Sequence, residues 1–279
     1  MAVSAADVKA LREKTGAGMM ECKKALVEAE GDFSRAVKIL KELGLAAAAK
    51  RSGRATNEGR IFTTVSDSTA AILEMGCETD FVARNTEFIE YGNRILDKIA
   101  AEKLTGKNPE LEGMVTELVS KIKENITIAR FAQMPVANDE LAVDYVHGEG
   151  SIGVIVKLKL ERPELADSPR VKEFAFDTAL HIAAFNPLYL DQNAVDPAYL
   201  KEQEEIFTVQ AKNLGKPENV VQGIVKGKVN KHMSEICLLN QGFVKEDKKS
   251  VSQVAAEVSK EAGGQVTIAE YIYYAVGAQ

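Results

Sequence analysis

The chain has 279 residues, of which 46% are hydrophobic and 27% charged, values ordinary for a soluble globular protein with room for more than one domain. Its net charge is −6, from 35 basic and 41 acidic residues, which argues against a protein that binds nucleic acid along its length. The uncharged stretch 43–49 is too short and too rich in alanine to cross a bilayer, and residues 1–14 contain no apolar signal core. We therefore expect a cytoplasmic protein with no membrane partner and no direct nucleic-acid partner.

The cysteines and histidines are too few and too scattered to predict a metal site or a disulfide framework. Cys22, Cys77 and Cys237 are odd in number, and no pair of them has metal-ligand spacing. Only three histidines are present, so a catalytic metal site built on histidine is not expected. The sequence predicts free thiols that are buried or half-buried, no bound metal and no cofactor.

The N-terminal residues 1–55 have the pattern of a small helical bundle. Ser4 is placed to cap a first helix, a second is expected over 19–29, and Asp32 is placed to cap a third. This segment carries 11 basic and 7 acidic residues, a net +4, which leaves −10 on the rest of the chain. Its charge suits an acidic protein surface, although a solvated helical surface explains it equally well. The alanine-rich, basic stretch 46–54 is predicted as a connector to the remainder.

Beyond this connector the hydrophobic pattern changes to the two-residue period of strands. The first half is expected to form a hairpin, two helices and a third strand, and the second half repeats that order. The expected strands are 60–65, 69–75, 126–136, 141–146, 152–160 and 266–274, and the expected helices are 85–101, 109–123 and 171–184. Residues 126–129, ITIA, resemble residues 266–269, VTIA, which supports a duplication.

These patterns predict an α+β fold. It would comprise an N-terminal three-helix domain similar to ubiquitin-associated domains and two repeated subdomains, each a three-stranded antiparallel sheet covered by helices. The expected domains are 1–55, 56–140 and 141–279. A helical hairpin, with its turn at Gly215-Lys216-Pro217, is expected as an insertion at about 188–235 in the last of these.

No motif for catalysis or nucleotide binding emerges. Gly227-Lys228 is followed by valine and lacks the upstream glycine of a phosphate-binding loop. Gly16-Ala17-Gly18 follows a predicted helix instead of a strand, so it is not a dinucleotide fingerprint. Cys77 lies close to Asp80 in sequence, but no base is present to orient either side chain. We therefore do not expect an enzyme.

The most informative stretch of the chain is Glu74 to Arg84, EMGCETDFVAR. A predicted strand ends there and a predicted helix follows, so Thr79-Asp80-Phe81-Val82 lies on a turn between two regular elements. An aromatic side chain on such a turn suits an anchor in a partner's pocket. The spacing alone favours the opposite arrangement, in which Phe81 and Val82 turn inward and cap the core.

Residues 11–26, LREKTGAGMMECKKAL, together with TDFVAR resemble the bacterial elongation factor Ts family. Later matches are HGEGSIGVIVKL at 147–158, HIAAFNP at 181–187 and NKHMSEICLLNQGFVKEDKKSV at 230–251, so the resemblance covers nearly the whole chain. It implies a nucleotide exchange factor that binds elongation factor Tu, with GDP or without nucleotide, and accelerates GDP release so that GTP can bind.

The resemblance also implies which residues act. The segment associated with displacing magnesium from elongation factor Tu corresponds to Thr79, Asp80, Phe81 and Val82. Further contacts with the partner are implied for Arg12, Met19, Met20 and His147. From the sequence alone, we expect at least one of the two methionines to be buried, and His147 could equally be a solvent-exposed loop residue. His181 lies among apolar neighbours and is expected to be structural.

Two other function classes remain open from the sequence. The first is a ribosome- or RNA-associated helper that uses the +4 segment and has no exchange activity. The second is an enzyme that uses Asp80 and Cys77, which would turn over substrate without a protein partner.

Overall fold

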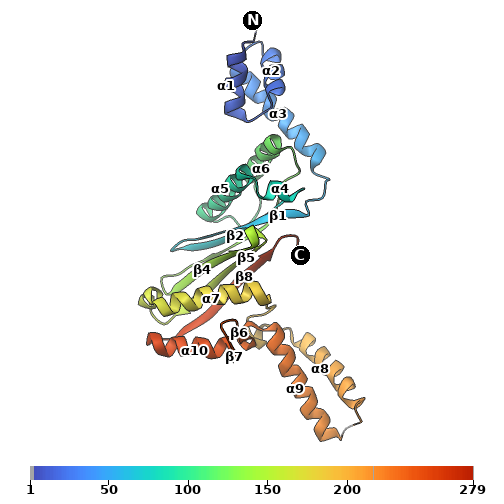
Figure 1. Ribbon diagram of the computed structural model, residues 1–279, viewed down its shortest axis with the longest axis vertical. Helices are drawn as coiled ribbons and strands as arrows, with labels where there is room; N and C mark the ends of the chain where they lie inside the picture. The colour runs from blue at the N-terminus through green and yellow to red at the C-terminus, as the bar shows by residue number, and fades with distance from the viewer. Residues whose placement is uncertain (1–2, 216, 279) are drawn as a thin grey trace.

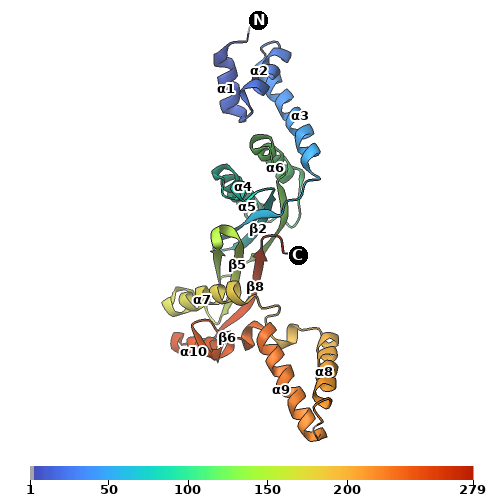
Figure 2. The same cartoon turned by 45° about the vertical axis from the view of Figure 1, so that its right-hand side comes forward.

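The computed structural model describes residues 3–215 and 217–278 and shows an elongated molecule (Figures 1 and 2). Three helices lie at one end, two small sheets with their helices form the middle, and a pair of long helices projects at the other end. The combination of helices with small antiparallel sheets confirms the predicted α+β class.

The N-terminal bundle consists of α1 (Ala5–Thr15), α2 (Met19–Glu28) and α3 (Phe33–Arg51). Ser4 caps α1 in a reciprocal capping box with Asp7. Asp32 caps α3 by accepting the N–H of Arg35 at 3.0 Å. Both predicted caps are confirmed, while the likeness to ubiquitin-associated domains stays a prediction.

Helix α3 is longer than the sequence pattern indicated. It continues through residues 46–51, which were predicted as a connector, because alanine is the best helix former and these six residues include no glycine or proline. Its second half packs on α6 (Pro109–Ile122). Gly44 permits this close approach, since a Cβ at that position would lie 2.3 Å from the Ser120 hydroxyl. The bundle is thus joined to the rest of the molecule through a packed helix.

The first sheet has the order β1-β2-β3, from β1 (Glu58–Val65), β2 (Thr69–Cys77) and β3 (Thr127–Pro135). Two helices, α5 (Thr86–Glu102) and α6, cover its outer face. A one-turn helix, α4 (Asp80–Ala83), connects β2 to α5 at the place where the sequence predicted a turn.

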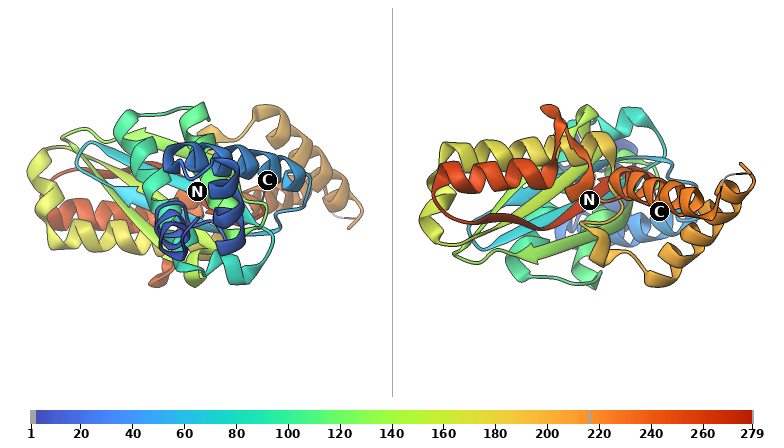
Figure 3. Two further views of the ribbon diagram at one scale, coloured as in Figure 1. Left: turned by 90° about the horizontal axis from the view of Figure 1, so that it is seen from above. Right: turned by 90° about the horizontal axis from the view of Figure 1, so that it is seen from below.

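The second sheet has the order β4-β5-β8, from β4 (Glu140–His147), β5 (Ile152–Leu160) and β8 (Val266–Ala275). Its outer face is covered by α7 (Pro169–Phe185) and α10 (Val251–Ala262), which lie side by side (Figure 3). Helix α10 and the short hairpin of β6 (Gly242–Phe243) and β7 (Glu246–Ser250) were not predicted. Short 3₁₀ helices lie between these elements, namely η1 (Gly148–Gly150), η2 (Pro163–Asp167), η3 (Gln192–Ala194) and η4 (Leu238–Asn240).

The two sheets stack face to face, so the middle of the molecule has four layers in the order helices, sheet, sheet, helices (Figure 1). Ile61, Ile72 and Ile155 are among the buried side chains between the sheets. All nine residues of β2 are buried, because this central strand has helices on one face and the second sheet on the other. Burial on both faces explains why β2 is apolar without alternation.

The duplication predicted from the repeated tetrapeptide is confirmed by an irregularity that both sheets share. The ladder between β2 and β3 shifts register at Ala129, which has no partner. The ladder between β5 and β8 shifts in the same way at Ala269. The similar tetrapeptides therefore mark equivalent bulges in the two halves.

A buried charge lies beside each bulge and contacts the other half. Glu74 on β2 accepts a hydrogen bond from Arg130 at 2.7 Å and another from the N–H of Gly277, just beyond β8, at 2.8 Å. Lys157 on β5 donates to the carbonyl of Pro135, at the end of β3, at 3.0 Å and pairs with Glu270. The two halves are thus joined at equivalent places, once by a buried acidic side chain on β2 and once by a buried basic side chain on β5.

The predicted helical hairpin is present as α8 (Pro197–Lys212) and α9 (Glu218–Ile236). Lys216, in the predicted turn between them, lies outside the described residues. Ala211 and Val221 are buried in the hairpin, and the N–H groups of Leu188 and Tyr189 fix its base by donating to the Ile236 carbonyl. Within 3–215 and 217–278, no helix is long and apolar enough to span a bilayer.

The ring of His181 on α7 is buried, which confirms its predicted structural role. Its Nδ1 accepts the N–H of Val244 at 3.1 Å, and its Nε2 donates to the side-chain oxygen of Gln241 at 2.9 Å. Burial lowers the pKa of His181 below its ordinary value of 6.5. The neutral ring therefore joins α7 to the β6–β7 segment.

Because folding lowers the pKa of His181, the unfolded chain binds a proton at this residue more readily than the folded chain. The stabilising contribution is complete above about pH 6.5 and is lost as the pH falls below that value. We expect the urea midpoint to fall between about pH 7 and about pH 5.5, and His181→Gln to flatten this dependence. An equal slope in both proteins, measured by circular dichroism, would contradict the assignment.

Two helical glycines provide a matched test of the core. A Cβ at Gly92 in α5 would lie 2.1 Å from the buried ring of Phe62, whereas a Cβ at Gly113 in α6 would have no atom within 4 Å. We expect Gly92→Ala to lower the free energy of unfolding by about 1–3 kcal/mol through overpacking. Gly113→Ala should raise it by about 0.5–1 kcal/mol, since alanine is the better helix former. Urea unfolding measures both, and a stabilising Gly92→Ala would show that the ring can move aside.

Candidate functional site

The candidate tetrapeptide divides between the surface and the core. Thr79 caps α4, with its hydroxyl accepting the N–H of Val82 at 3.4 Å. Phe81 is 82% exposed, whereas Val82 and Ala83 are buried in the core under α5 and α6. The inward arrangement left open by the sequence is therefore wrong for Phe81 and correct for Val82, because consecutive helical residues point about 100° apart.

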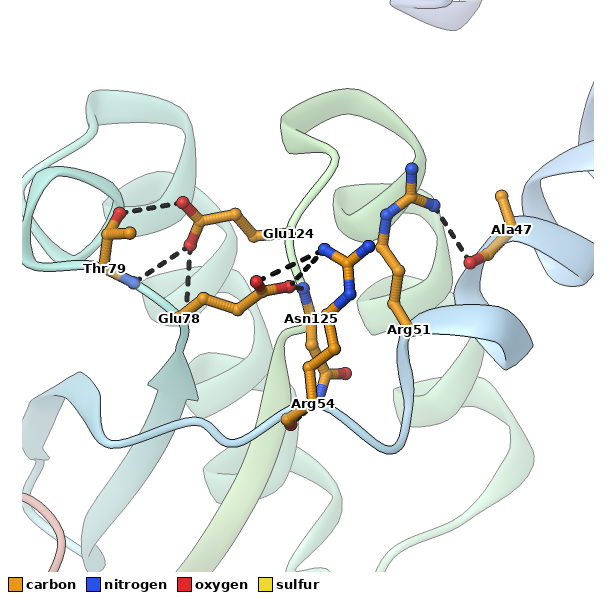
Figure 4. Close-up of polar contacts among 7 residues, drawn as sticks. All are labelled: Ala47, Arg51, Arg54, Glu78, Thr79, Glu124 and Asn125. Atoms are coloured by element: carbon orange, nitrogen blue, oxygen red, sulfur yellow. Dashed lines mark hydrogen bonds and ion pairs between the residues drawn. The ribbon is translucent and has the colours of Figure 1, made fainter.

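A carboxylate from a distant part of the chain holds the start of α4. Glu124, in the turn between α6 and β3, accepts the backbone N–H groups of Glu78 and Thr79, each at 3.1 Å (Figure 4). It also accepts the Thr79 hydroxyl at 2.8 Å. Three hydrogen bonds to one carboxylate hold the backbone at the point where β2 ends.

A second carboxylate extends this network to the end of α3. Glu78 accepts the N–H of Asn125 at 2.6 Å and the guanidinium of Arg54 at 3.2 Å (Figure 4). The Asn125 amide in turn donates to the Arg54 carbonyl at 2.7 Å. The Asn125 hydrogen bond, with help from Arg54, lowers the pKa of Glu78. Sequence reasoning missed Arg54, Glu78, Glu124 and Asn125, since no local pattern relates segments so far apart in the chain.

Arg84 links α4 to η1, the short 3₁₀ helix that follows His147. Its guanidinium lies 3.9 Å from the Asp80 carboxylate and 3.3 Å from the carboxylate of Glu149 on η1. His147, which immediately precedes η1, is exposed, and its Nδ1 lies 2.9 Å from the Tyr145 hydroxyl. The loops of both sheets therefore meet at one edge of the molecule.

The α1–α2 turn packs on the end of α6, close to the residues that hold α4. A Cβ at Gly16 would lie 2.8 Å from the Lys121 side chain, and Glu21 pairs with Lys123 at 3.1 Å. Met19 and Met20, which precede Glu21, are 44% and 64% exposed. The expectation that one methionine is buried is wrong, because both lie at the open N-terminal end of α2, before its buried stripe begins at Cys22.

Arg12 on α1 is exposed, and its backbone carbonyl accepts the N–H of Gly16. Arg12, Met19 and Met20 thus lie on the N-terminal bundle, whereas Asp80 and Phe81 lie on α4 and His147 lies just before η1.

The local chemistry does not suit Cys77 to nucleophilic catalysis. Its thiol is buried and donates to the Thr79 carbonyl at 3.2 Å. Burial, together with the nearby Glu124 carboxylate, raises the pKa of Cys77 to about 12, so the reactive thiolate is scarce at neutral pH. Among the described residues, no group of three or more histidine, cysteine or acidic side chains is arranged to hold a metal ion.

Comparison with known proteins identifies the family. The sequence model of the family described as Elongation factor TS matches residues 78–278. The chain belongs to the elongation factor Ts family. It is 48% identical to Elongation factor Ts of Treponema denticola over 277 residues, which are 99% of both chains. It is 45% identical to Elongation factor Ts of Borrelia recurrentis, covering 99% of this chain and 100% of that one. It is 43% identical to Elongation factor Ts of Clostridium perfringens strain SM101, covering 99% of this chain and 93% of that one.

Membership of the elongation factor Ts family confirms the resemblance seen in the sequence motifs. The roles of Thr79, Asp80, Phe81, Val82, Arg12, Met19, Met20 and His147 stay predictions.

Proposed function

We propose that the chain is a nucleotide exchange factor that binds elongation factor Tu in the cytoplasm and accelerates its release of GDP, so that GTP can bind. The observation that carries this proposal is Phe81, an aromatic side chain 82% exposed on an anchored turn in a member of the elongation factor Ts family. The chain catalyses no chemical step of its own in this proposal.

Exchange is a problem of coupled binding. A factor that loosens GDP must bind the nucleotide-free partner more tightly, and GDP must weaken binding of the factor by the same ratio. Each factor of ten in that ratio requires about 1.4 kcal/mol of contacts that differ between the two states. The differential contacts must therefore come from side chains that reach toward the nucleotide site of the partner.

Phe81 and Asp80 are the side chains best suited to that purpose. Phe81 would insert between elements of the partner, because an exposed aromatic ring can fill an apolar pocket. Asp80 is half-exposed and would bring a negative charge toward the cation that organises the phosphates. Thr79 and the buried Val82 would hold α4 in place, so their contribution would be indirect.

The N-terminal bundle and η1 would add affinity on either side of α4. Met19 and Met20 offer exposed, flexible thioethers, which suit an adaptable protein surface. Arg12 and His147 would add polar contacts. A ribosome- or RNA-associated role without exchange is the competing proposal, based on the +4 charge of residues 1–55. RNA binding with a steep salt dependence and no effect on GDP release would favour it.

The decisive test is release of a fluorescent GDP analogue from elongation factor Tu in a stopped-flow instrument. The wild-type chain should accelerate release, and Phe81→Ala should reduce the acceleration about thirtyfold, the equivalent of about 2 kcal/mol for an anchor residue. Because Phe81 is exposed, its loss should change the free energy of unfolding by less than about 0.5 kcal/mol. Phe185→Ala, which removes a half-exposed ring on α7, serves as the control. Equal losses of stability and activity would assign Phe81 to the fold instead.

Asp80 has a separate test, since a charge that disturbs the partner's magnesium site should act only when magnesium is present. Asp80→Asn keeps the size of the side chain and removes the charge. We expect its deficit in GDP release to be largest at high magnesium and to shrink when the ion is chelated. Asp67→Asn, in the exposed β1–β2 turn, is the matched control. A deficit that is constant across the magnesium titration would mean that Asp80 only supports α4.

A further inference from the structure

The turn between α6 and β3 contacts two candidate partner-binding segments with consecutive residues. Lys123 pairs with Glu21 at 3.1 Å, beside Met19 and Met20, while Glu124 accepts three hydrogen bonds at the start of α4. Neither Lys123 nor Glu124 is among the site residues predicted from the sequence. We infer that Glu124 is a positioning residue for exchange, which sets the orientation of α4 and therefore of Phe81. This inference rests on the proposed function.

The geometry gives Glu124 control of the whole one-turn helix. One carboxylate oxygen receives both backbone N–H groups, and the other receives the Thr79 hydroxyl (Figure 4). Because that hydroxyl donates its only proton to Glu124, its lone pairs are left to accept the N–H of Val82. The cap of α4 is thus oriented by Glu124. A helix of four residues has little stability of its own, so its direction depends on such a cap.

The turn that carries Glu124 is itself held from the other side. Lys123 ends α6 with a left-handed backbone, φ +70°, a conformation that glycine or asparagine adopts at lower cost. Its side chain reaches Glu21, whose carboxylate also accepts the N–H of Gly18 at 3.0 Å. Asn125, the next residue, donates its N–H to Glu78. Contacts on both sides therefore fix the direction in which Glu124 points.

Positioning can be separated from simple stabilisation because Phe81 is exposed, whereas the hydrogen bonds of Glu124 go to Glu78 and Thr79. If Glu124 acts by orienting α4, then removing Phe81 first should reduce the effect of changing Glu124 on exchange to the part that acts through Asp80 on the same helix. If Glu124 only stabilises the fold, the two changes should add, since independent effects are additive.

The experiment is a double-mutant cycle on GDP release from elongation factor Tu. Glu124→Gln keeps the shape but weakens the charge-assisted hydrogen bonds, so we expect the stimulated rate to fall about tenfold. In the Phe81→Ala background the same substitution should lower the rate by about threefold or less, the remaining loss acting through Asp80. Glu112→Gln removes an exposed carboxylate from α6 and should leave the rate at the wild-type value. A wild-type rate for Glu124→Gln, or an unchanged tenfold loss without Phe81, would overturn the inference.

A second readout is independent of exchange. In the chain labelled with 4-fluorophenylalanine, the fluorine signal of Phe81 is identified by its absence from Phe81→Ala. Glu124→Gln should shift or broaden this signal while the signals of buried rings such as Phe88 and Phe174 stay in place. An unmoved Phe81 signal would overturn the positioning role. Failure of the wild-type chain to accelerate GDP release from elongation factor Tu, with a moved Phe81 signal, would instead refute the proposed function and leave the positioning contact supported.

Discussion

The arrangement of this protein depends on the burial of β2 between a layer of helices and a second sheet. A strand covered on both faces cannot slip by one residue without reversing which side chains each layer receives, and here a slip would also separate Glu74 from Arg130. The register of β2 is therefore strongly specified, and so are the positions of its two ends. Helix α4 begins just after β2 ends, so Phe81 projects from a part of the backbone that has little freedom to move.

The candidate surface combines segments from three parts of the chain, and different interactions hold them. Exposed ion pairs such as Arg84–Glu149 contribute little stability, because water and salt screen both charges. The hydrogen bonds that Glu124 accepts from backbone N–H groups are shielded better and have defined directions. The placement of α4 therefore rests on the turn after α6, while the approach of η1 rests mainly on the stacking of the two sheets that carry it.

Much of the fold follows from local signals, and the exceptions have physical reasons. Strand periodicity, the caps at Ser4 and Asp32 and the repeated tetrapeptide predicted the helices, the sheets and the duplication. Helix α10 was missed although Ser250 and Gln253 form a capping box. The site was harder, because whether Phe81 or Val82 faces solvent depends on what covers α4. The role of Glu124 depends on a contact between residues 45 apart in the chain, which no local pattern reports.

The contact between Glu74 and Gly277 has a consequence for how the chain is made. The two residues are 203 positions apart, and Glu74 lies on the same face of β2 as Ile72, the face that the second sheet covers, so its carboxylate keeps its water until β8 has formed and supplies this N–H donor. Arg130 donates to the Ala275 carbonyl, so it too lacks one of its hydrogen-bond partners until β8 has formed. The first half of a growing chain would therefore remain incompletely paired until β8 has been made, and its final consolidation would be an event shared by both halves.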